Sequence, residues 1–408
     1  MVTRPARRLP AGLTALLLAL FVLAGCGSIN RLDPPPLAAT PSLPILGIDN
    51  ARFWPDAETE PLLREVRQLR ERQAAAAGPR QVPPARNFLA LSGGGDNGAF
   101  GAGLLVGWTA SGRRPLFDVV TGISAGALIA PFAFLGPDYD PQLREVFTEV
   151  APHDVIRMGS MLRAVLFGEA LADTTPLYRL IERHVNAEML SAIATEYGRG
   201  RLLLIGTTNL DLGRPVLWNI GAIAASGHPR ALELFRRILL ASASIPGAFP
   251  PVLVDVDVEG RAYQEMHVDG GATIQMFLYP PTVSLTASRG RRSQTERTAW
   301  VVRNGRLDTE WSSTNRSILG IASRSAATLL HFSAVNDIAR IFLTTQRDGV
   351  QFRLAYIGPE FDAPRAEPFD TAFMRALFDY GYRQGLEGNR WRDSLRPITS
   401  IDRTAAAQ

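Results

Sequence analysis

Two strand–turn–helix units, close together in the chain, constrain the fold of this protein more than any other feature. In the first, the apolar run 88–92 leads into a glycine-rich turn and then into the apolar residues 104–108. In the second, the run 117–121 passes through Gly-Ile-Ser-Ala-Gly at 122–126 into another apolar stretch. Apolar strands that alternate with helices in this way form a mainly parallel sheet with helices on both faces. We therefore expect an α/β fold in which the two turns contribute to one site.

The rest of the chain continues this alternation. Strands are predicted at 88–92, 119–123, 202–207, 299–303 and 352–357, with a hairpin formed by 252–258 and 262–268. Helices are predicted at 101–110, 125–134, 176–185, 231–241 and 369–385, and a long one at 317–345 is expected to pack over the sheet. The composition, 46% hydrophobic and 20% charged, is typical of a globular protein.

The N-terminus has the pattern of a secretory signal. Arginines at 4, 7 and 8 precede an apolar stretch at 12–24, which is too short to span a bilayer. Without these three arginines the formal net charge falls from +4 to +1, so the charge does not indicate a nucleic-acid partner. The only cysteine, Cys26, ends the sequence Leu-Ala-Gly-Cys, which resembles a bacterial lipobox. We expect a signal peptide at 1–25 and lipidation of Cys26.

The domain boundaries follow from proline and glycine content. Residues 26–86 are predicted to be the lipidated N-terminus and a proline-rich tether, with a solvated helix at 62–77. The main domain is predicted at 87–385 and a C-terminal tail at 386–408.

The first glycine turn allows three interpretations. Residues 93–98 match the dinucleotide fingerprint, but the second strand ends in a glycine turn where the ribose-binding acid would stand. Tight turning and close helix packing explain the later glycines, but not three in succession. We favour an oxyanion hole in which the backbone amides of Gly93, Gly94 and Gly95 face a substrate carbonyl.

Ser124 is the candidate nucleophile. It lies between a predicted buried strand and an apolar helix, where a sharp turn would expose its hydroxyl. Gly122 and Gly126 flank it because side chains at these positions would collide across the turn. The alternative is that Ser124 only caps the helix.

The base that activates this hydroxyl is left open by the residues alone. Asp269 ends the second strand of the predicted hairpin and is followed by two glycines, so its carboxylate would face a cleft. A turn aspartate is the simpler interpretation. Among the five histidines, His267 is the best alternative because it shares a strand face with Asp269, and His331 is the other candidate.

Four segments in this order resemble the patatin-like phospholipase family. They are Gly93-Gly94-Gly95 with Gly98, Gly122 to Gly126, residues 241–251, and Asp269-Gly270-Gly271. The resemblance implies a three-layer α/β/α fold and a Ser-Asp dyad, with Ser124 as nucleophile and Asp269 as base. It further implies hydrolysis of lipid esters, of the phospholipase A or lysophospholipase type, through an acyl-enzyme, with neither metal nor cofactor.

The chain departs from the family at Asn97, where the family often has a basic residue. This leaves simpler lipid esters open as substrates, unless Arg113 and Arg114 supply the charge. The apolar segments 131–135 and 158–167 are expected to be core rather than a lid.

The predicted partners are a lipid substrate and a membrane, and the predicted location is the bacterial envelope, on the periplasmic side of the outer membrane. A triad esterase or thioesterase, or a lipid-binding lipoprotein without catalysis, would be the alternatives.

Overall fold

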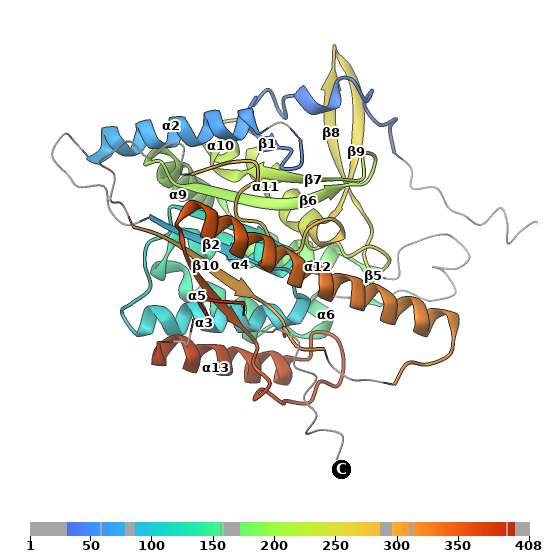
Figure 1. Ribbon diagram of the computed structural model, residues 1–408. Coiled ribbons are helices and arrows are strands. Elements are labelled where there is room, and N and C mark those ends of the chain that lie inside the picture. The colour runs from blue at the N-terminus through green and yellow to red at the C-terminus, as the bar shows by residue number, and fades with distance from the viewer. Residues whose placement is uncertain are drawn as a thin grey trace, which may run out of the picture.

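A mixed sheet of nine strands forms the centre of the molecule in the computed structural model (Figure 1). The structure describes residues 31–57, 59–77, 86–155, 157–158, 172–285, 296–309, 313–388 and 391–395. Five neighbouring strands are parallel, in the order β6 (Leu202–Asn209), β3 (Val119–Ile123), β2 (Arg86–Leu91), β10 (Arg297–Arg303) and β11 (Gln351–Tyr356). The predicted mainly parallel sheet is therefore confirmed.

Antiparallel strands extend the sheet beside β6. They are β7 (Arg214–Asn219), β1 (Arg52–Phe53) and the hairpin of β8 (Val252–Val258) and β9 (Arg261–Asp269). In the register of β6 with β9, Thr207 lies opposite Asp269. In the register of β3 with β6, Ile123 lies opposite Gly206. The carboxyl end of β9 is therefore placed next to the carboxyl end of β3.

Helices cover both faces of the sheet. Their bounds are α2 (Glu60–Ala77), α3 (Gly98–Ala110), α4 (Ala125–Leu135), α5 (Asp140–Thr148), α6 (Pro152–Val155), α8 (Thr175–His184), α9 (Ala187–Gly198), α10 (Ile220–Ala225), α11 (Ala231–Ser242), α12 (Ile318–Asp348) and α13 (Thr371–Glu387). A separate two-stranded sheet joins β4 (Arg157–Met158) and β5 (Ala172–Asp173). All the predicted strands and helices are present, with bounds that differ by a few residues.

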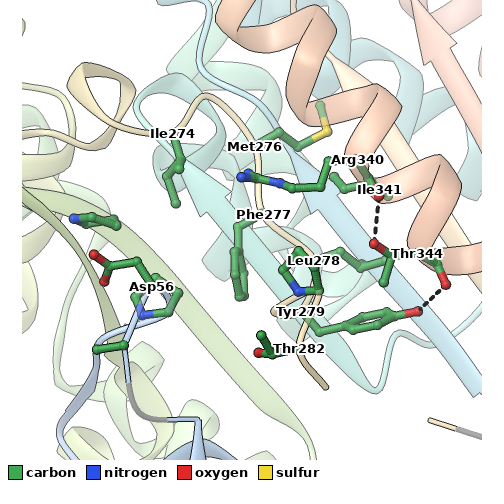
Figure 2. A pocket seen from close by; sticks show the side chains of 14 residues that line it. Asp56, Ile274, Met276, Phe277, Leu278, Tyr279, Thr282, Arg340, Ile341 and Thr344 are labelled. Atoms are coloured by element: carbon green, nitrogen blue, oxygen red, sulfur yellow. Dashed lines mark hydrogen bonds between the residues drawn. The ribbon is translucent and has the colours of Figure 1, made fainter. Parts of the chain in front are cut away.

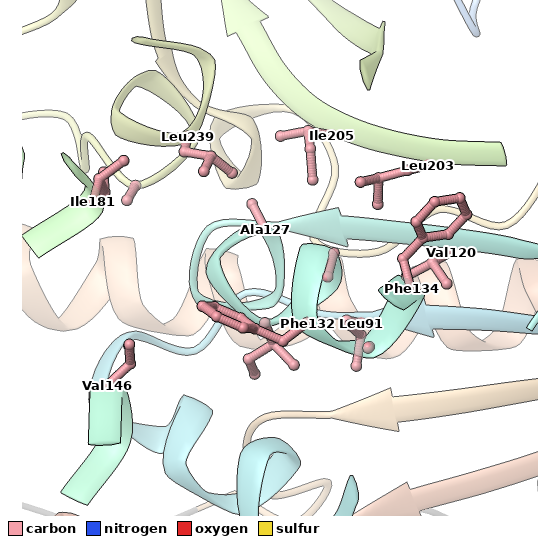
Figure 3. Close-up of a cluster of buried hydrophobic side chains, with 14 of the residues drawn as sticks. Leu91, Val120, Ala127, Phe132, Phe134, Val146, Ile181, Leu203, Ile205 and Leu239 are labelled. Carbon is pink, nitrogen blue, oxygen red and sulfur yellow. The ribbon is translucent and has the colours of Figure 1, made fainter. Parts of the chain in front are cut away.

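The alternation of side chains along β2 shows the three layers. Leu89 and Leu91 belong to a buried cluster with residues of α3, α4 and α13, whereas Ala90 packs with Ile338 and Ile341 of α12. Successive residues of a strand point to opposite faces, so these helices form the two outer layers. Figure 3 shows the first cluster, in which Phe134 of α4 lies near the strand residues Val120 and Leu203. Residues 131–134 are thus core, as expected.

The predicted tether is wrong for most of its length. Arg52 of β1 pairs with Trp218 of β7 in the sheet, and its side chain lies 2.5 Å from Glu265 in a buried ion pair. Leu62 and Leu69 of α2 are buried, so this helix packs against the domain. Proline-rich sequence excludes regular structure locally, but it does not prevent the residues between prolines from packing.

Two other boundaries also need correction. The predicted tail begins too early, because α13 continues to Glu387 and Trp391 packs against Trp108 and Trp300, with ring centroids 5.0 and 4.8 Å apart. The long helix α12 packs over the sheet only in its second half, since nothing between 318 and 333 is buried. The signal peptide, Cys26 and most of the segment 158–167 lie outside the described residues.

Candidate active site

A sharp turn between β3 and α4 presents Ser124. Its φ of 55° and ψ of −125° are strained for a residue with a side chain, and such strain is typical of functional turns. A Cβ atom on Gly122 would overlap with the carbonyl oxygen of Gly126, and one on Gly126 would overlap with the carbonyl oxygen of Leu91. The expected collision across the turn is therefore real, and both glycines are needed for this geometry.

The structure brings Ser124 and Asp269 together at the carboxyl edge of the sheet. The Ser124 hydroxyl lies beside the Asp269 carboxylate, whose Oδ1 accepts a hydrogen bond from the Gly271 amide at 2.7 Å. Both residues are buried, at about 5% exposure. Burial raises the pKa of Asp269 to about 6, against the lowering effect of the Ser124 hydroxyl and the Gly271 amide. At neutral pH the carboxylate is thus ionised and has an unusually high proton affinity.

The end of α11 fixes the backbone of both residues. The Ser242 hydroxyl accepts from the Ser124 amide at 3.0 Å and donates to the Gly206 carbonyl at 2.6 Å. The Asp269 amide donates to the Ser244 carbonyl at 2.9 Å. In the sequence, residues 241–251 stand out only by the family resemblance. These hydrogen bonds show that Ser242 and Ser244 hold the backbone at Ser124 and Asp269.

The glycine loop after β2 offers two amides to a ligand. The Gly93 amide donates to the Gln275 carbonyl at 3.2 Å and is therefore occupied. Within the described residues nothing accepts from the amides of Gly94 and Gly95. A Cβ atom on Gly94 would overlap with the carbonyl oxygen of Asn304, so the loop passes too close to β10 for any other residue. Of the three predicted oxyanion donors, Gly94 and Gly95 are available in this structure and Gly93 is not.

The histidines serve other purposes. His267 is fully buried, with Nδ1 at 3.0 Å from the Thr207 hydroxyl and Nε2 at 3.1 Å from Glu265. His331 lies on α12, where its ring contacts Phe332. All five histidines belong to the described part of the chain, and there no hydrogen bond joins an imidazole to Ser124. Both ring nitrogens of His267 thus lie against its own neighbours, and the residue is two pairs away from Asp269 in the register of β6 with β9.

Comparison with known proteins agrees with this geometry. The family model for patatin-like phospholipases matches residues 89–279, which include the glycine loop, Ser124 and Asp269. This segment is a patatin-like phospholipase domain. The match over this segment supports a lipid acyl hydrolase. No curated protein matches the chain in sequence.

Three solved structures are similar to parts of this chain at low identity. VipD from Legionella pneumophila is 11% identical, with a TM-score of 0.38, over 76% of this chain and 68% of that one. The type III effector ExoU is 14% identical, with a TM-score of 0.32, over 75% and 53%. Human GIVD cytosolic phospholipase A2 is 11% identical, with a TM-score of 0.33, over 83% and 68%.

Arg113 and Arg114 do not replace the basic residue that is absent at Asn97. Arg114 is buried against Asp140 at 2.8 Å and donates to the Ala133 carbonyl. Arg113 donates to the Leu386 carbonyl. Both lie beyond the C-terminal end of α3, whereas Asn97 directly precedes its N-terminal end, so the helix separates them by about 18 Å.

The sequence reasoning missed several residues that support the patatin-like site. Arg303, at the carboxyl end of β10, is buried and donates to the Gly93 carbonyl at 3.2 Å. Asp337 of α12 accepts from the backbone amides of Gln275 and Met276 at 2.7 and 3.0 Å. Gln275 in turn connects to the loop after Asp269, since its side-chain amide donates to the Gly271 carbonyl at 3.0 Å. An arginine at the end of an apolar strand, and an aspartate within an apolar helix, were the available signals.

A cavity of about 220 Å³ opens beside the segment that follows Asp269 (Figure 2). Ile274, Phe277 and Leu278 line it together with Arg340 and Thr344 of α12. Ser124 and Asp269 are not among its lining residues, so it is a neighbour of the site rather than the site itself. Within the described residues, no group of three histidines, cysteines or acidic residues could hold a metal ion.

Proposed function

We propose that the protein hydrolyses lipid esters with Ser124 as the nucleophile and Asp269 as the general base. The observation that supports this most directly is the position of the Ser124 hydroxyl beside the buried Asp269 carboxylate, where the ends of β3 and β9 meet. A base must lie within hydrogen-bond reach of the proton it removes, and its pKa should lie near the working pH. Asp269 meets both conditions, and no imidazole among the described residues meets the first.

The reaction follows from this arrangement. As the Ser124 oxygen attacks the ester carbonyl, its proton passes to Asp269, and the new oxyanion accepts from the amides of Gly94 and Gly95. The tetrahedral intermediate then collapses to an acyl-enzyme, and the alcohol leaves with the proton from Asp269. Water attacks the acyl-enzyme with the same carboxylate as base, which releases the fatty acid and restores the serine.

The substrate is proposed to be a phospholipid or a lysophospholipid, cleaved at an acyl ester. With Asn97 in the loop and Arg113 and Arg114 far from it, a single-chain ester without a phosphate group remains an outcome of the substrate test.

The membrane is the proposed place of action. Lipidation of Cys26, in its lipobox-like sequence, would anchor the protein in the bacterial envelope, on the periplasmic side of the outer membrane. Several acyl chains on one terminus are needed for stable anchoring, because a single chain binds only marginally. Mass spectrometry of the mature N-terminus would test this.

The catalytic proposal is tested by hydrolysis of a panel of lipids and by labelling with a fluorophosphonate, which reacts only with an activated serine. We expect Ser124→Ala and Asp269→Asn each to reduce kcat by at least about two orders of magnitude. Ser244→Ala is the matched control, because its hydroxyl bonds only the Leu240 carbonyl of its own helix.

The alternatives give different results. A triad esterase would lose acyl-enzyme formation in His267→Gln or His331→Gln. A lipid-binding protein without catalysis would show no label at Ser124 in the folded wild type, and this result would refute the proposal.

A further inference from the structure

The first half of α12 is an exposed apolar helix. We call residues 318–333 the arm. None of its side chains is buried, and six large apolar residues are between 40% and 90% exposed: Ile318, Leu319, Ile321, Leu329, Leu330 and Phe332. The helix Ile318–Asp348 is long and apolar enough to cross a membrane by length and composition, with a mean hydropathy of 1.3 over an 18-residue window that is only 6% buried. A monomeric soluble protein rarely leaves so much apolar surface in water.

The arm projects from the edge of the sheet that carries Ser124. At the C-terminal end of α12, Asp348 accepts from the Leu285 amide, and the Leu285 carbonyl accepts from Arg297, the first residue of β10. In the middle of α12, Asp337 holds Gln275, which lies against Gly93 at the carboxyl end of β2. The helix therefore runs opposite to the strands, and its first half continues past their carboxyl edge.

The arm is about 24 Å long at 1.5 Å per residue, and Figure 1 shows its N-terminal end standing clear of the sheet. Through Asp337 and Gln275, the base of the arm is connected by hydrogen bonds to the glycine loop of the site.

The apolar surface of the arm is wider than the stripe that one packed helix would cover. At 3.6 residues per turn, the six large apolar residues cover about half of the helix circumference. Arg324 and His331, seven positions apart, lie on the other half. A second helix covers only a narrow stripe of such a surface, whereas a lipid phase covers all of it. The segment 313–333 has two arginines and no acidic residue, which suits a surface of anionic lipids.

We propose that the arm inserts into the surface of a lipid bilayer and brings the edge of the sheet that carries Ser124 against it. The occupant is lipid rather than protein because the apolar surface covers about half of the helix circumference, wider than the seam against one partner helix, and lies on the side from which a lipid substrate must enter. This inference builds on the proposed function, but insertion itself can be measured without catalysis.

The test uses the full-length chain with Cys26→Ser, which has no cysteine, and with Ser124→Ala, so that lipids stay intact. An environment-sensitive fluorophore is attached at Leu329→Cys or at Leu116→Cys. Leu116 is the matched control, because it is 65% exposed, as Leu329 is at 73%, but precedes β3 at the opposite edge of the sheet.

With vesicles of phosphatidylcholine and phosphatidylglycerol, we expect the emission from position 329 to shift to shorter wavelengths. Brominated acyl chains should quench it, and position 116 should remain unchanged. No shift and no quenching at position 329 would overturn the proposal.

A shift without vesicles that grows with protein concentration would assign the arm to a second copy. A label already shielded in dilute protein would assign it to another segment of this chain. Either of these results would also overturn the proposal.

Catalysis gives a second readout. With Cys26→Ser in all variants, Leu329→Asp combined with Phe332→Asp should reduce hydrolysis of vesicle lipids at least about tenfold. Hydrolysis of a soluble short-chain ester should be unchanged, and Leu116→Asp should affect neither. Equal losses on both substrates would refute a role of the arm in lipid docking. Absence of ester hydrolysis in the wild type would instead refute the proposed function and leave the fluorescence result standing.

A second inference comes from the buried arginine at the glycine loop. The Gly93 carbonyl accepts from the Ser92 hydroxyl at 2.7 Å and from the Arg303 guanidinium at 3.2 Å. This carbonyl and the Gly94 amide belong to one planar trans peptide and point in opposite directions. Two donors on the carbonyl therefore orient the amide away from β10 and strengthen it as a donor.

We infer that Arg303 is a positioning residue, which acts on the oxyanion through the peptide between Gly93 and Gly94. Burial lowers the pKa of Arg303 to about 10, with the charge of Asp337 acting in the other direction, so the guanidinium stays charged at neutral pH. This inference also rests on the proposed function.

The test compares Arg303→Met with Arg201→Met. Arg201 is an equally buried arginine that bonds the Phe117 and Phe134 carbonyls, away from the glycine loop. We expect kcat of folded Arg303→Met to fall about tenfold with KM nearly unchanged. Arg303→Lys should recover most of the lost kcat, and Arg201→Met should keep the kcat of the wild type. Should Arg303→Met fail to fold, Arg303→Lys alone should lower kcat without changing KM.

NMR of glycine-labelled protein gives a readout that needs no activity, since the Gly94 amide proton should move upfield in Arg303→Met. Unchanged kcat and an unmoved Gly94 resonance would overturn the inference. An inactive wild type with a shifted Gly94 resonance would refute only the proposed function.

Discussion

Replacing the buried aspartate by its neutral analogue should stabilise the protein while it inactivates it. Asp269 is about 5% exposed, and among the described residues no arginine or histidine pairs with it. Its charge is stabilised by the Gly271 amide, which donates to Oδ1, and by the neighbouring Ser124 hydroxyl. Asp269→Asn should therefore raise the free energy of unfolding at neutral pH, because the folded state no longer buries a charge.

The magnitude follows from proton linkage. The pKa of Asp269 is 3.8 in an unfolded chain and about 6 when it is folded, which corresponds to about 3 kcal/mol. Because the folded state binds the proton more tightly, the wild type loses this stability as the pH rises from about 4 to about 6. Asparagine keeps an acceptor for Gly271 but weakens the interaction with Ser124, so we expect a net gain of about 1–3 kcal/mol at pH 8.

The assay is denaturant unfolding of the full chain at several pH values between 4 and 8. The difference between Asp269→Asn and the wild type should be small near pH 4 and grow to its full value above pH 6. Asp362→Asn, an exposed aspartate, should show no such pH dependence. If Asp269→Asn were less stable than the wild type at pH 8, or if the difference did not change with pH, the reasoning about the buried charge would be wrong.

Three further predictions follow from the same site. The pH profile of kcat/KM should rise through a pKa of about 6, because Asp269 accepts a proton only when ionised, and a profile that is flat between pH 5 and 7 would contradict this. Gly94→Ala should lower kcat at least about a hundredfold, because its Cβ would displace the loop from Asn304. The control Gly112→Ala lies in open space and should only lower the stability, because the φ of Gly112 is positive. Ser242→Ala should cost about 1–3 kcal/mol in unfolding experiments and lower kcat, since it leaves the buried Ser124 amide without an acceptor, and Ser244→Ala should keep kcat.

The N-terminal segment shows that composition alone does not reveal which residues pack against the domain. Prolines and charged residues at 34–86 predicted a tether, but Arg52 forms a buried ion pair with Glu265, and Glu265 also accepts from His267. Burial alone would raise the pKa of Glu265, but the bond from His267 and the charge of Arg52 lower it to about 2. A buried arginine has no signature in the sequence, because its partner lies 213 positions away.

The sequence by itself determined the local features of this protein. Apolar runs fixed the strands, and the Gly-x-Ser-x-Gly pattern placed Ser124 between β3 and α4, because a sharp turn admits few other residues. The order of four motifs then indicated the family. Each of these features depends on neighbours within a few positions along the chain.

Only the tertiary structure decided which groups meet. His267 and Asp269 share one face of β9, and the sequence could not choose between them. The register places Asp269 opposite Thr207, beside the end of β3, and His267 opposite Asn209, two pairs farther away. In the same way, the bond from Gly93 to Gln275, the position of Arg303 and the exposure of the arm depend on how distant strands and helices align. Register and docking are set by the whole core, so no short stretch of sequence contains them.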